Sequence, residues 1–380
     1  MSEFTDSGSF SRRAAVKAAL AAPLASVRSS AANSAVTVGL IGAGSRGTYV
    51  AGLMAKNTPA RVVALCDVVD GKSEKAQKSI GIENPRIYKD FHKLLASDVD
   101  AVIIATPVFL HADHFEAAVK SGKHIYIEKP ASADVEGCKR IMRAADSADR
   151  KVNITFGFQR RYGQVYQKAK RLADSGAIGQ IRLGHAHFIK SEGAWGGAEK
   201  LPPPKTEMEK IVAWQGWKEL SGDLIVENNV HSIDVLNWFL GGHPHSAIGS
   251  GGSSLPKQGD MRDHNFVAFE YGKGVQGQLS GTTLAAPGYR DVIEQFHGEK
   301  GMIETSENHW RHYSGPGQMT TEKSPRNISI DSVADFVSRI AEAKPENTGV
   351  RGAESTLTAI LGRMAMDLRR EVSWNEMMKG

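Results

Sequence analysis

Apolar runs alternate with helix-like segments along the first half of the chain. Each run is short, and the stretch after it carries apolar residues at helical spacing. The runs lie at residues 36–41, 61–66, 101–105, 123–127 and 152–158, and the helical stretches include 48–56, 111–120 and 134–147. Strands that alternate with helices form a parallel sheet with right-handed crossovers. The pattern therefore predicts an α/β domain over residues 36–158.

The second half of the chain has a different pattern. Runs that read as strands, with turn residues between them, occur at residues 181–190, 266–271, 274–283 and 292–297. Such runs are typical of an antiparallel sheet. Amphipathic helices are expected at 330–343 and 350–370, with a short strand near 372–374, whereas residues 201–217 have no clear period. We predict a second α/β domain over residues 159–380.

The first apolar run ends in a glycine pattern, Gly42-x-Gly44-x-x-Gly47. Gly42 permits a tight strand-to-helix turn, Gly44 leaves room for phosphates, and Gly47 lets helix and strand pack closely. The N-terminus of the helix that follows offers N–H groups to an anion, and we assign Ser45 and Arg46 of this turn to the cofactor site. This order predicts a Rossmann domain that binds a dinucleotide.

Asp67 ends the second apolar run, about where an acid that binds the ribose is expected. A carboxylate there accepts both ribose hydroxyls and repels a 2′-phosphate. We therefore expect NAD, with NADP less favoured. Lys72 and Arg46 are the cations near enough in sequence to weaken this preference.

Composition excludes several classes of protein. The chain has 380 residues, of which 41% are hydrophobic and 23% are charged, and a formal net charge of +5. Because no concentrated basic run accompanies that charge, we expect no nucleic-acid partner. No apolar run is long enough to span a bilayer, so no membrane insertion is expected. Histidine pairs such as His185 and His187 lack an acid placed to complete a set of ligands, and we expect no metal.

Residues 1–35 do not read as part of the fold. Arg12, Arg13 and Lys17 precede a weakly apolar, alanine-rich run, and small residues follow. This segment resembles a twin-arginine export signal, which predicts a periplasmic protein with a leader that is cleaved or disordered. The alternative is an alanine- and serine-rich leader on a cytoplasmic protein.

Several motifs together resemble the glucose-fructose oxidoreductase and inositol dehydrogenase family, Gfo/Idh/MocA. Besides the glycine pattern, they are Ala105-Thr106-Pro107 with His111, Gly122-Lys123-His124, Glu128-Lys129-Pro130, residues 157–162 and His231-Ser232-Ile233-Asp234. The resemblance covers nearly everything after the leader. It implies a C-terminal domain with an open, mostly antiparallel sheet, a carbohydrate substrate, and a homodimer or homotetramer.

Lys129 is the first candidate for catalysis. It follows a strand end on the cofactor side, where an ammonium group can polarise a substrate hydroxyl, and the resemblance implies a catalytic lysine at this motif. By default a lysine is a solvated surface residue. Thr106, Pro107, His111 and Glu128 belong to the same strand-end loops, and we assign them, with Lys129, to the cofactor site.

His231 is the second candidate. On a helix, Glu227 and His231 are four residues apart and Asp234 is three further on, so a carboxylate is expected to orient the imidazole. The alternative is a capping network above an apolar stripe. Relatives commonly carry Asp at the position of Glu227. This leaves His231 as the expected base, with Glu227 either direct or orienting.

Side chains for substrate binding are expected near these two groups. Arg160, Arg161 and Tyr162 follow a strand end, Asn228 carries an amide suited to a polyol, and Trp217, like Trp214, can stack on a sugar or pack in a core. The leading hypothesis is an NAD-dependent oxidoreductase that acts on a secondary hydroxyl of a sugar, glycoside or cyclitol. One alternative is a glycoside hydrolase that oxidises C3 transiently, eliminates the aglycone and reduces the carbon again. Another is a sugar-binding protein without activity.

Overall fold

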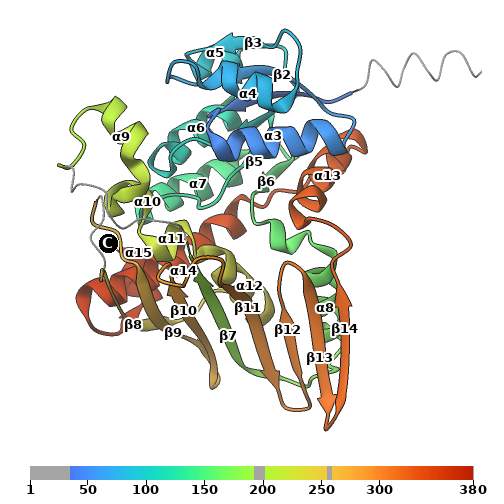
Figure 1. Cartoon of the computed structure of the whole chain (residues 1–380), viewed down its shortest axis with the longest axis vertical. Coiled ribbons are helices and arrows are strands. Elements are labelled where there is room, and N and C mark those ends of the chain that lie inside the picture. The colour runs from blue at the N-terminus through green and yellow to red at the C-terminus, as the bar shows by residue number, and fades with distance from the viewer. Residues whose placement is uncertain (1–34, 192–201, 255–258, 380) are drawn as a thin grey trace, which may run out of the picture.

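The computed structural model describes residues 35–191, 202–254 and 259–379. A parallel sheet wrapped by helices forms one part, and a large sheet forms the other, with helices between the two sheets (Figure 1). The leader predicted over residues 1–35 lies almost wholly outside the described residues. Within those residues, no helix is long and apolar enough to cross a membrane.

The first sheet has six parallel strands in the order β3-β2-β1-β4-β5-β6. This is the strand order of a Rossmann domain and confirms the predicted fold. Its strands are β1 (Thr37–Ile41), β2 (Arg61–Cys66), β3 (Arg86–Tyr88), β4 (Ala101–Ile104), β5 (His124–Ile127) and β6 (Ile154–Phe156). The prediction missed β3, because this edge strand is short and two of its three residues are exposed.

Helices connect these parallel strands. They are α3 (Ser45–Asn57), α4 (Lys72–Ile80), α5 (Phe91–Leu95), α6 (His111–Lys120) and α7 (Val135–Ser147). Asp134 fixes the start of α7, because its carboxylate accepts a hydrogen bond from the backbone N–H of Gly137 at 2.7 Å. Asp90 caps α5 in the same way through the N–H of His92.

The second sheet has nine strands in the order β14-β13-β12-β11-β7-β10-β9-β8-β15. All neighbours are antiparallel except β7 and β10, as the prediction of a mostly antiparallel sheet requires. The strands are β7 (Ile181–Lys190), β8 (Ser246–Gly252), β9 (His264–Gly272), β10 (Val275–Thr282), β11 (Arg290–Gly298), β12 (Met302–Thr305), β13 (His309–Gly315), β14 (Gln318–Lys323) and β15 (Val372–Ser373).

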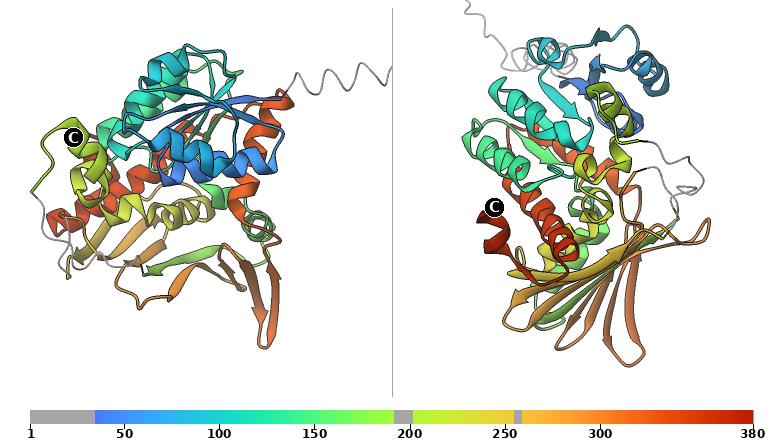
Figure 2. Two further views of the ribbon diagram at one scale, coloured as in Figure 1. Left: turned by 45° about the horizontal axis from the view of Figure 1, so that its top comes forward. Right: turned by 90° about the vertical axis from the view of Figure 1, so that its left-hand side faces the viewer.

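Helices cover one face of this sheet and leave the other open (Figure 2). The covering helices are α8 (Gln164–Asp174), α12 (Val230–Leu240) and α14 (Gly349–Leu368). Phe239 of α12 stacks on Phe296 of β11 with ring centroids 4.1 Å apart. Along β7, Ala186 and Phe188 point to this covered side and are buried. Strand alternation therefore divides β7 and β11 into a covered face and an open face.

The chain returns to the Rossmann domain near its end. Helix α13 (Ile328–Ala341) packs Val333, Phe336 and Val337 into the core of that domain, and the ring of Phe336 lies 5.6 Å from that of Tyr126. The two halves of the chain thus share packing, and the boundary after residue 158 stays a prediction. The remaining helices are α9 (Glu207–Ala213), α10 (Lys218–Ser221), α11 (Leu224–Glu227) and α15 (Trp374–Lys379), with 3-10 turns η1 (Val108–Leu110), η2 (Gln159–Arg161) and η3 (Trp214–Gly216).

Candidate active site

The glycine loop between β1 and α3 has the geometry that its three glycines predict. Gly42 has φ +92°, and a Cβ there would lie 2.6 Å from the carbonyl oxygen of Ala105. A Cβ on Gly47 would lie 2.0 Å from the carbonyl oxygen of Gly42, so the helix and the turn touch at this point. Gly44 has open space where its Cβ would be. The loop is therefore tight on the protein side and bare on the side that a phosphate would approach.

The carboxylate of Asp67 holds this loop from the second strand. It accepts hydrogen bonds from the backbone N–H groups of Ala43 and Val69, both at 2.9 Å. Asp67 also lines a hollow of about 400 Å³, which we call the cofactor hollow. Predicted cofactor residues that line it are Gly42, Gly44, Ser45, Arg46, Asp67, Thr106 and Pro107. The bare glycine loop and the acid at the second strand fit the phosphates and a ribose of a dinucleotide.

Arg46 and Glu128 join the glycine loop to the Glu128-Lys129-Pro130 loop. The guanidinium of Arg46 lies 2.9 Å from the carboxylate of Glu128, whose side chain is buried. Burial opposes the charge of Arg46, but Glu128 outweighs that effect and raises the pKa of the guanidinium. The ion pair thus fixes the loop that carries Lys129 against the start of α3.

Lys129 reaches across to the second domain. Its ammonium donates a short hydrogen bond to the backbone carbonyl of Glu227 and lies 3.4 Å from the Oε1 atom of the same residue. Both side chains are mostly enclosed, at 11% and 17% exposure. Lys129 therefore takes its position from the C-terminal end of α11.

The predicted link between Glu227 and His231 is wrong. The helix expected through residues 227–234 is interrupted, since α11 ends at Glu227 and α12 begins at Val230. The carboxylate of Glu227 faces Lys129 and accepts from the amide of Asn228 at 2.5 Å. The carboxylate of Asp234 does not face the imidazole either, because it accepts hydrogen bonds from two nitrogens of Arg161. Neither acid orients the imidazole.

The ring of His231 lies beside Lys129 in the same cavity. Among the residues that the structure describes, none forms a hydrogen bond with its enclosed Nδ1 atom. This leaves Nε2 as the nitrogen that a ligand in the cavity can reach. Burial lowers the pKa of His231 well below its ordinary value, and the charges of Lys129 and Arg160 act in the same direction. The imidazole is therefore neutral at neutral pH.

His111 braces the two loops that meet at Lys129. Its Nδ1 atom lies 2.7 Å from the carbonyl of Pro130, and its Nε2 atom lies 2.9 Å from the carbonyl of Thr106. Burial lowers the pKa of His111, although both carbonyls oppose this shift. Because each ring nitrogen lies against a backbone carbonyl of one loop, His111 fixes the loops around Lys129.

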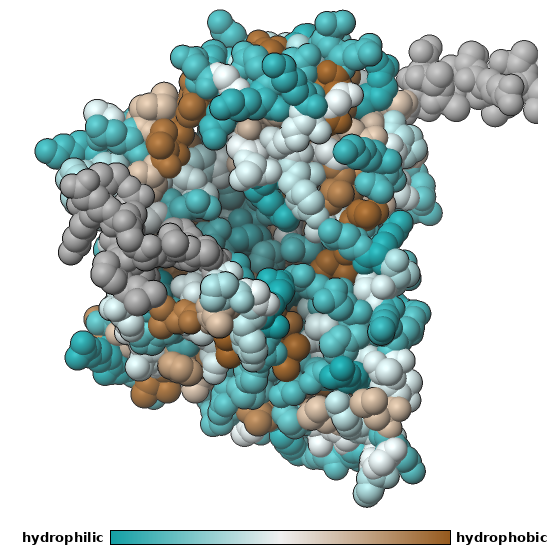
Figure 3. All heavy atoms as spheres, in the orientation of Figure 1, coloured by the Kyte–Doolittle hydropathy of each residue, from teal (hydrophilic) through white to brown (hydrophobic). Residues whose placement is uncertain are grey.

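Lys129 and His231 line one cavity of about 280 Å³, which we call the central cavity. The central cavity adjoins the cofactor hollow, because both are lined by Arg46, Ala105, Thr106, Trp214 and Gln215. Figure 3 shows that the surface between the two domains is hollowed and mostly hydrophilic. Glu128, Glu227, Asn228 and His111 also line the central cavity. The structure thus gathers the main catalytic candidates at one edge of the cofactor hollow.

Other predicted substrate residues lie elsewhere. Arg160 is buried, with its guanidinium 2.5 Å from the carboxylate of Glu294. Arg161 and Tyr162 line a separate depression beside α13, and Arg161 lies over the ring of Trp238. None of these three lines the central cavity, because ion pairs and packing hold their side chains elsewhere. Their predicted assignment to the substrate is therefore wrong.

An aromatic side chain lines both cavities, but it belongs to a tryptophan near the predicted one. Trp217 lines neither the central cavity nor the cofactor hollow, whereas Trp214 lines both. The capping box of Thr206 and Glu209 starts α9, and η3 follows it directly, so the turn that carries Trp214 and Gln215 is set against both spaces.

Three charged residues of the central cavity were not predicted from the sequence: Lys190, Arg290 and Glu307. Alternation along β7 puts Lys190 on the face of Phe188. That pattern was available from the sequence, but which face is covered depends on helices distant in the chain.

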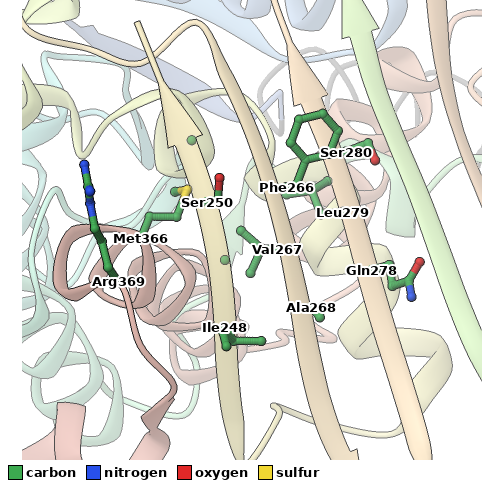
Figure 4. Close-up of a pocket in the computed structure, with 12 residues that line it drawn as sticks. Ile248, Ser250, Phe266, Val267, Ala268, Gln278, Leu279, Ser280, Met366 and Arg369 are labelled. Atoms are coloured by element: carbon green, nitrogen blue, oxygen red, sulfur yellow. The ribbon is translucent and has the colours of Figure 1, made fainter.

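A further hollow lies on the open face of the nine-stranded sheet. Figure 4 shows the residues of β8, β9 and β10 that line it, with Met366 of α14 and Arg369, which follows that helix, beside β8. Ile248 and Phe266 are 54% and 58% exposed there. The residues that line this hollow include no acid–base group that lies next to the cofactor hollow. Among residues 35–191, 202–254 and 259–379, no group of three or more His, Cys, Asp or Glu side chains is placed to hold a metal ion.

A Rossmann domain with its glycine loop, joined to a sheet domain that places Lys129 and His231 beside the cofactor hollow, defines an NAD(P)-dependent oxidoreductase. Residues 36–156 match the model of the oxidoreductase family with an NAD-binding Rossmann fold, and residues 166–304 match the GFO/IDH/MocA C-terminal domain. The chain therefore belongs to the Gfo/Idh/MocA family, and its first domain binds NAD(H).

Curated relatives include inositol dehydrogenases. An inositol 2-dehydrogenase of Rhizobium meliloti (strain 1021) is 29% identical over 271 residues, which cover 70% of this chain and 74% of the relative. The scyllo-inositol 2-dehydrogenase (NAD(+)) of Bacillus subtilis (strain 168) is 27% identical over 314 residues, 81% of this chain and 82% of the relative.

Solved structures share the fold at lower identity. A levoglucosan dehydrogenase in complex with NADH and levoglucosan has a TM-score of 0.76 at 19% identity, covering 89% of this chain and 99% of that one. An apo scyllo-inositol dehydrogenase from Lactobacillus casei has a TM-score of 0.70 at 23% identity, covering 89% and 98%. These likenesses support the architecture across both domains.

Proposed function

We propose that this protein uses NAD⁺ to oxidise a secondary hydroxyl group of a sugar, glycoside or cyclitol. The observation that carries the proposal is that Lys129 and His231 line one cavity that adjoins the cofactor hollow. The names of the relatives, inositol and levoglucosan dehydrogenases, support this class of substrate. Reaction with NAD⁺ is reversible in principle, and the same residues serve reduction.

The cofactor hollow has the residues to hold the dinucleotide. The bare glycine loop and the first turn of α3 would bind the phosphates, and Asp67 would bind the ribose hydroxyls, which favours NAD over NADP. A bound NAD⁺ supplies the acceptor for a hydride. The protein's own part is to hold the substrate carbon against that acceptor and to remove a proton from the hydroxyl.

His231 takes the hydroxyl proton in this proposal. Its lowered pKa keeps the ring neutral at neutral pH, so the Nε2 atom is able to accept a proton from a substrate in the central cavity. As the O–H proton moves to Nε2, the C–H bond breaks with both electrons and the C=O bond forms. The hydrogen and both electrons of that bond would pass as a hydride to a bound NAD⁺, while His231 keeps the proton.

Lys129 stabilises the alkoxide that develops in the same step. Glu227 holds the ammonium through its backbone carbonyl and faces it with a carboxylate, so Lys129 keeps its position. A fixed cation beside a developing negative charge lowers the barrier more than a mobile one. Asn228, next to Glu227, is positioned to hydrogen-bond a further hydroxyl of the substrate.

Absorbance of reduced nicotinamide tests this proposal. The purified protein is mixed with NAD⁺ and a panel of inositols, anhydrosugars, free sugars and aryl glycosides. A rise with at least one compound, and a weaker rise with NADP⁺, is expected. Release of aglycone without a lasting rise would favour the redox-assisted hydrolase instead. Binding of sugars without either signal would favour the non-catalytic alternative.

We further propose that the protein is exported and that it self-associates. Arg12 and Arg13 before an alanine-rich run support export, and a reporter fused to residues 1–35 should leave the cytoplasm only while both arginines are intact. Exposed Ile248 and Phe266 on the open sheet face support a dimer or tetramer. Sedimentation of the wild type and of Phe266→Asp measures the oligomeric state. A monomeric wild type would contradict the proposed self-association.

A further inference from the structure

Helix α9 carries exposed aliphatic side chains. None of its seven residues is buried, and Val212 is 68% exposed, with Ile211 only partly buried beside it. A helix of a folded domain ordinarily packs its apolar side against the core. In Figure 1, α9 lies away from the nine-stranded sheet and beside the Rossmann domain. The apolar side of α9 is therefore available to a ligand.

Two aliphatic side chains of α9 line the cofactor hollow. Ile211 and Val212 reach it from the second domain, and Trp214 and Gln215 of η3 follow them. The other residues that line the hollow belong to the Rossmann domain. Trp214 and Gln215 also line the central cavity, whereas Ile211 and Val212 do not. Helix α9 thus lies along the part of the hollow that is farther from the central cavity.

The position of α9 is fixed from its C-terminal end. A Cβ on Gly259 would collide with the carbonyl oxygen of Gly216 in η3, so the two backbones touch. That carbonyl accepts a hydrogen bond from the N–H of Asp260 at 3.0 Å, and the carboxylate of Asp260 accepts one from the N–H of Lys218 at 2.8 Å. Helix α10 in turn lies against η1 of the Rossmann domain. These contacts hold η3, and α9 with it, at the hollow.

The adenine of the dinucleotide fits this part of the hollow. In a Rossmann domain, the acid after the second strand binds the adenosine ribose, whose 2′-hydroxyl carries the extra phosphate in NADP. Asp67 has the place of that acid, and Val68 and Val69, which follow it, line the same hollow. Val68 is 45% exposed. A base attached to that ribose would lie beyond Asp67, among apolar side chains and away from the glycine loop.

The lining side chains suit the flat faces of a base. Val68 and Leu110 line the hollow from the Rossmann domain, and Ile211 and Val212 line it from α9. The charged residues of α9, all of which the structure describes, do not line it. Ligand sites are mostly lined by apolar side chains, and covering an aromatic ring with them is favourable in proportion to the area removed from water. The exposed side of α9 and the base would thus cover each other.

We propose that Ile211 and Val212 bind the adenine ring of the dinucleotide. Val68 and Leu110 supply the Rossmann side of the same site. The adenine site is then shared by both domains, and α9 adds cofactor-binding residues that lie outside the Rossmann domain. The inference rests on the placement of NAD in the cofactor hollow that the proposed function uses, and it does not depend on which sugar is oxidised.

Calorimetric binding measurements test the inference on the full chain, freed of any dinucleotide that copurifies. Ile211→Ser and Val212→Ser should each raise the Kd of NAD⁺ and of ADP-ribose by about 3- to 10-fold, because each removes aliphatic area from the base. The double variant should raise both Kd values by about 10- to 100-fold. Met208→Ser is the matched control, since Met208 is an exposed residue of the same helix that does not line the hollow. Thermal unfolding checks that each variant is folded.

Hydrogen exchange distinguishes the adenine end of the cofactor from the nicotinamide end. ADP-ribose, which contains the adenine, should slow amide exchange over residues 207–213, because a ligand bound to α9 opposes local opening of the helix. Nicotinamide mononucleotide, which lacks the adenosine half, should leave exchange over residues 207–213 unchanged. Val212→Ser should weaken the protection that ADP-ribose gives.

Three results would overturn the inference. They are unchanged Kd values in the single and double variants, slowed exchange over residues 207–213 with nicotinamide mononucleotide, and no binding of ADP-ribose to the wild type. A loss of self-association in Val212→Ser with an unchanged Kd for NAD⁺ would assign the exposed side chains to a second copy of the chain, and it also overturns the inference.

The proposed function fails in a different way. If the variants lose affinity for NAD⁺ as expected but no sugar reduces NAD⁺ on the wild type, the adenine site is supported and the dehydrogenase is contradicted. If a sugar reduces NAD⁺ and the Kd values of the variants equal that of the wild type, the dehydrogenase is supported and the adenine site is overturned.

Discussion

The wall that the Rossmann domain gives to the cofactor hollow and the wall that the sheet domain gives to the central cavity are built in different ways. The Rossmann wall consists of loops at the carboxyl ends of parallel strands, and its chief features are bare backbone at Gly44 and the short-range bonds of Asp67. The sheet wall consists of long side chains from β7, β11 and the residues around α12, held by ion pairs such as Arg160 with Glu294. The first wall presents backbone groups to its ligand, and the second wall presents charged side chains.

In the proposed function, this difference separates the groups that bind the cofactor from the groups that select and activate the substrate. A backbone wall accepts any ligand with a pyrophosphate in the right place. A wall of charged side chains fixes the charge and the orientation of its ligand. Changes to the sheet wall should therefore act on the sugar and on the chemistry, and changes to the Rossmann wall on the nicotinamide cofactor.

The largest loss of activity is expected when His231 is substituted. His231→Asn should lower kcat by about 10²- to 10⁴-fold, because a positioned base contributes that much to proton transfer. The KM for NAD⁺ should change little. His185→Asn is the control, since His185 lies on the other face of β7 from Ala186 and Phe188. Steady-state kinetics with the best sugar substrate measure kcat and the KM for NAD⁺. An unchanged kcat would show that His231 is not the catalytic base.

The buried ion pair under the sheet wall should affect stability. Glu294→Gln leaves the guanidinium of Arg160 without its partner and also weakens bonds from Ser232 and Thr305. Breaking a buried pair costs about 3–5 kcal/mol. Urea unfolding should show this loss. Glu299→Gln, which breaks an exposed pair with Arg182, serves as the control and should change stability little. Equal stability of both variants would mean that the pair is dispensable.

Asp67 is the side chain whose loss should act on the Rossmann wall alone. Asp67→Asn should raise the KM for NAD⁺ by about 10-fold or more, because a charged acceptor for the ribose is lost. Discrimination against NADP⁺ should fall, and the KM for the sugar should stay the same. Asp70→Asn, which changes an exposed acid paired with Lys89, is the matched control. Equal effects on sugar and cofactor would contradict the separation of the walls.

A smaller effect concerns acid stability of the Rossmann wall. Burial lowers the pKa of His114 to about 4, so below pH 6.5 the unfolded chain binds a proton that the folded chain does not. Stability present above that pH is then lost as the pH falls toward 4, by about 1.4 kcal/mol per pH unit for this histidine. In His114→Asn that share of the loss should disappear. Thermal unfolding between pH 7 and pH 5 measures it, and an unchanged pH dependence would contradict the shift.

Activity should resist acid for the same physical reason. The proposed base, His231, has a strongly lowered pKa, so its neutral form persists well below pH 6.5. We expect kcat to hold on moderate acidification and to fall only as the pH passes through the lowered value. A loss of activity centred on the ordinary histidine pKa of about 6.5 would contradict this.

The sequence was sufficient for the Rossmann wall because its signals are local. The strand at Thr37–Ile41, the three glycines and Asp67 lie within a short stretch, and each role follows from backbone geometry. Lys129 was found through its motif. Nothing in the spacing shows that it reaches Glu227, about a hundred residues away in sequence, through a backbone carbonyl.

The sheet wall was less predictable because long-range pairing builds it. Helical spacing suggested a bond from Glu227 to His231, but Lys129 and Asn228 engage that acid instead. Arg160 was assigned to substrate, yet its partner Glu294 comes from a strand far along the chain. Lys190 and Arg290 meet only through the register of β7 and β11. The strands β8, β12 and β14 were missed for a related reason, since they are glycine-rich, short or exposed.

Transfer of deuterium tests most directly whether the two walls form one active site. The best sugar substrate, labelled at the carbon that is oxidised, is mixed with the enzyme and NAD⁺ for a single turnover, and the nicotinamide is analysed by mass spectrometry. Deuterium is expected to pass directly to the nicotinamide ring, and His231→Asn should abolish transfer while it still binds NAD⁺. Unlabelled reduced cofactor, or full transfer in His231→Asn, would contradict this expectation.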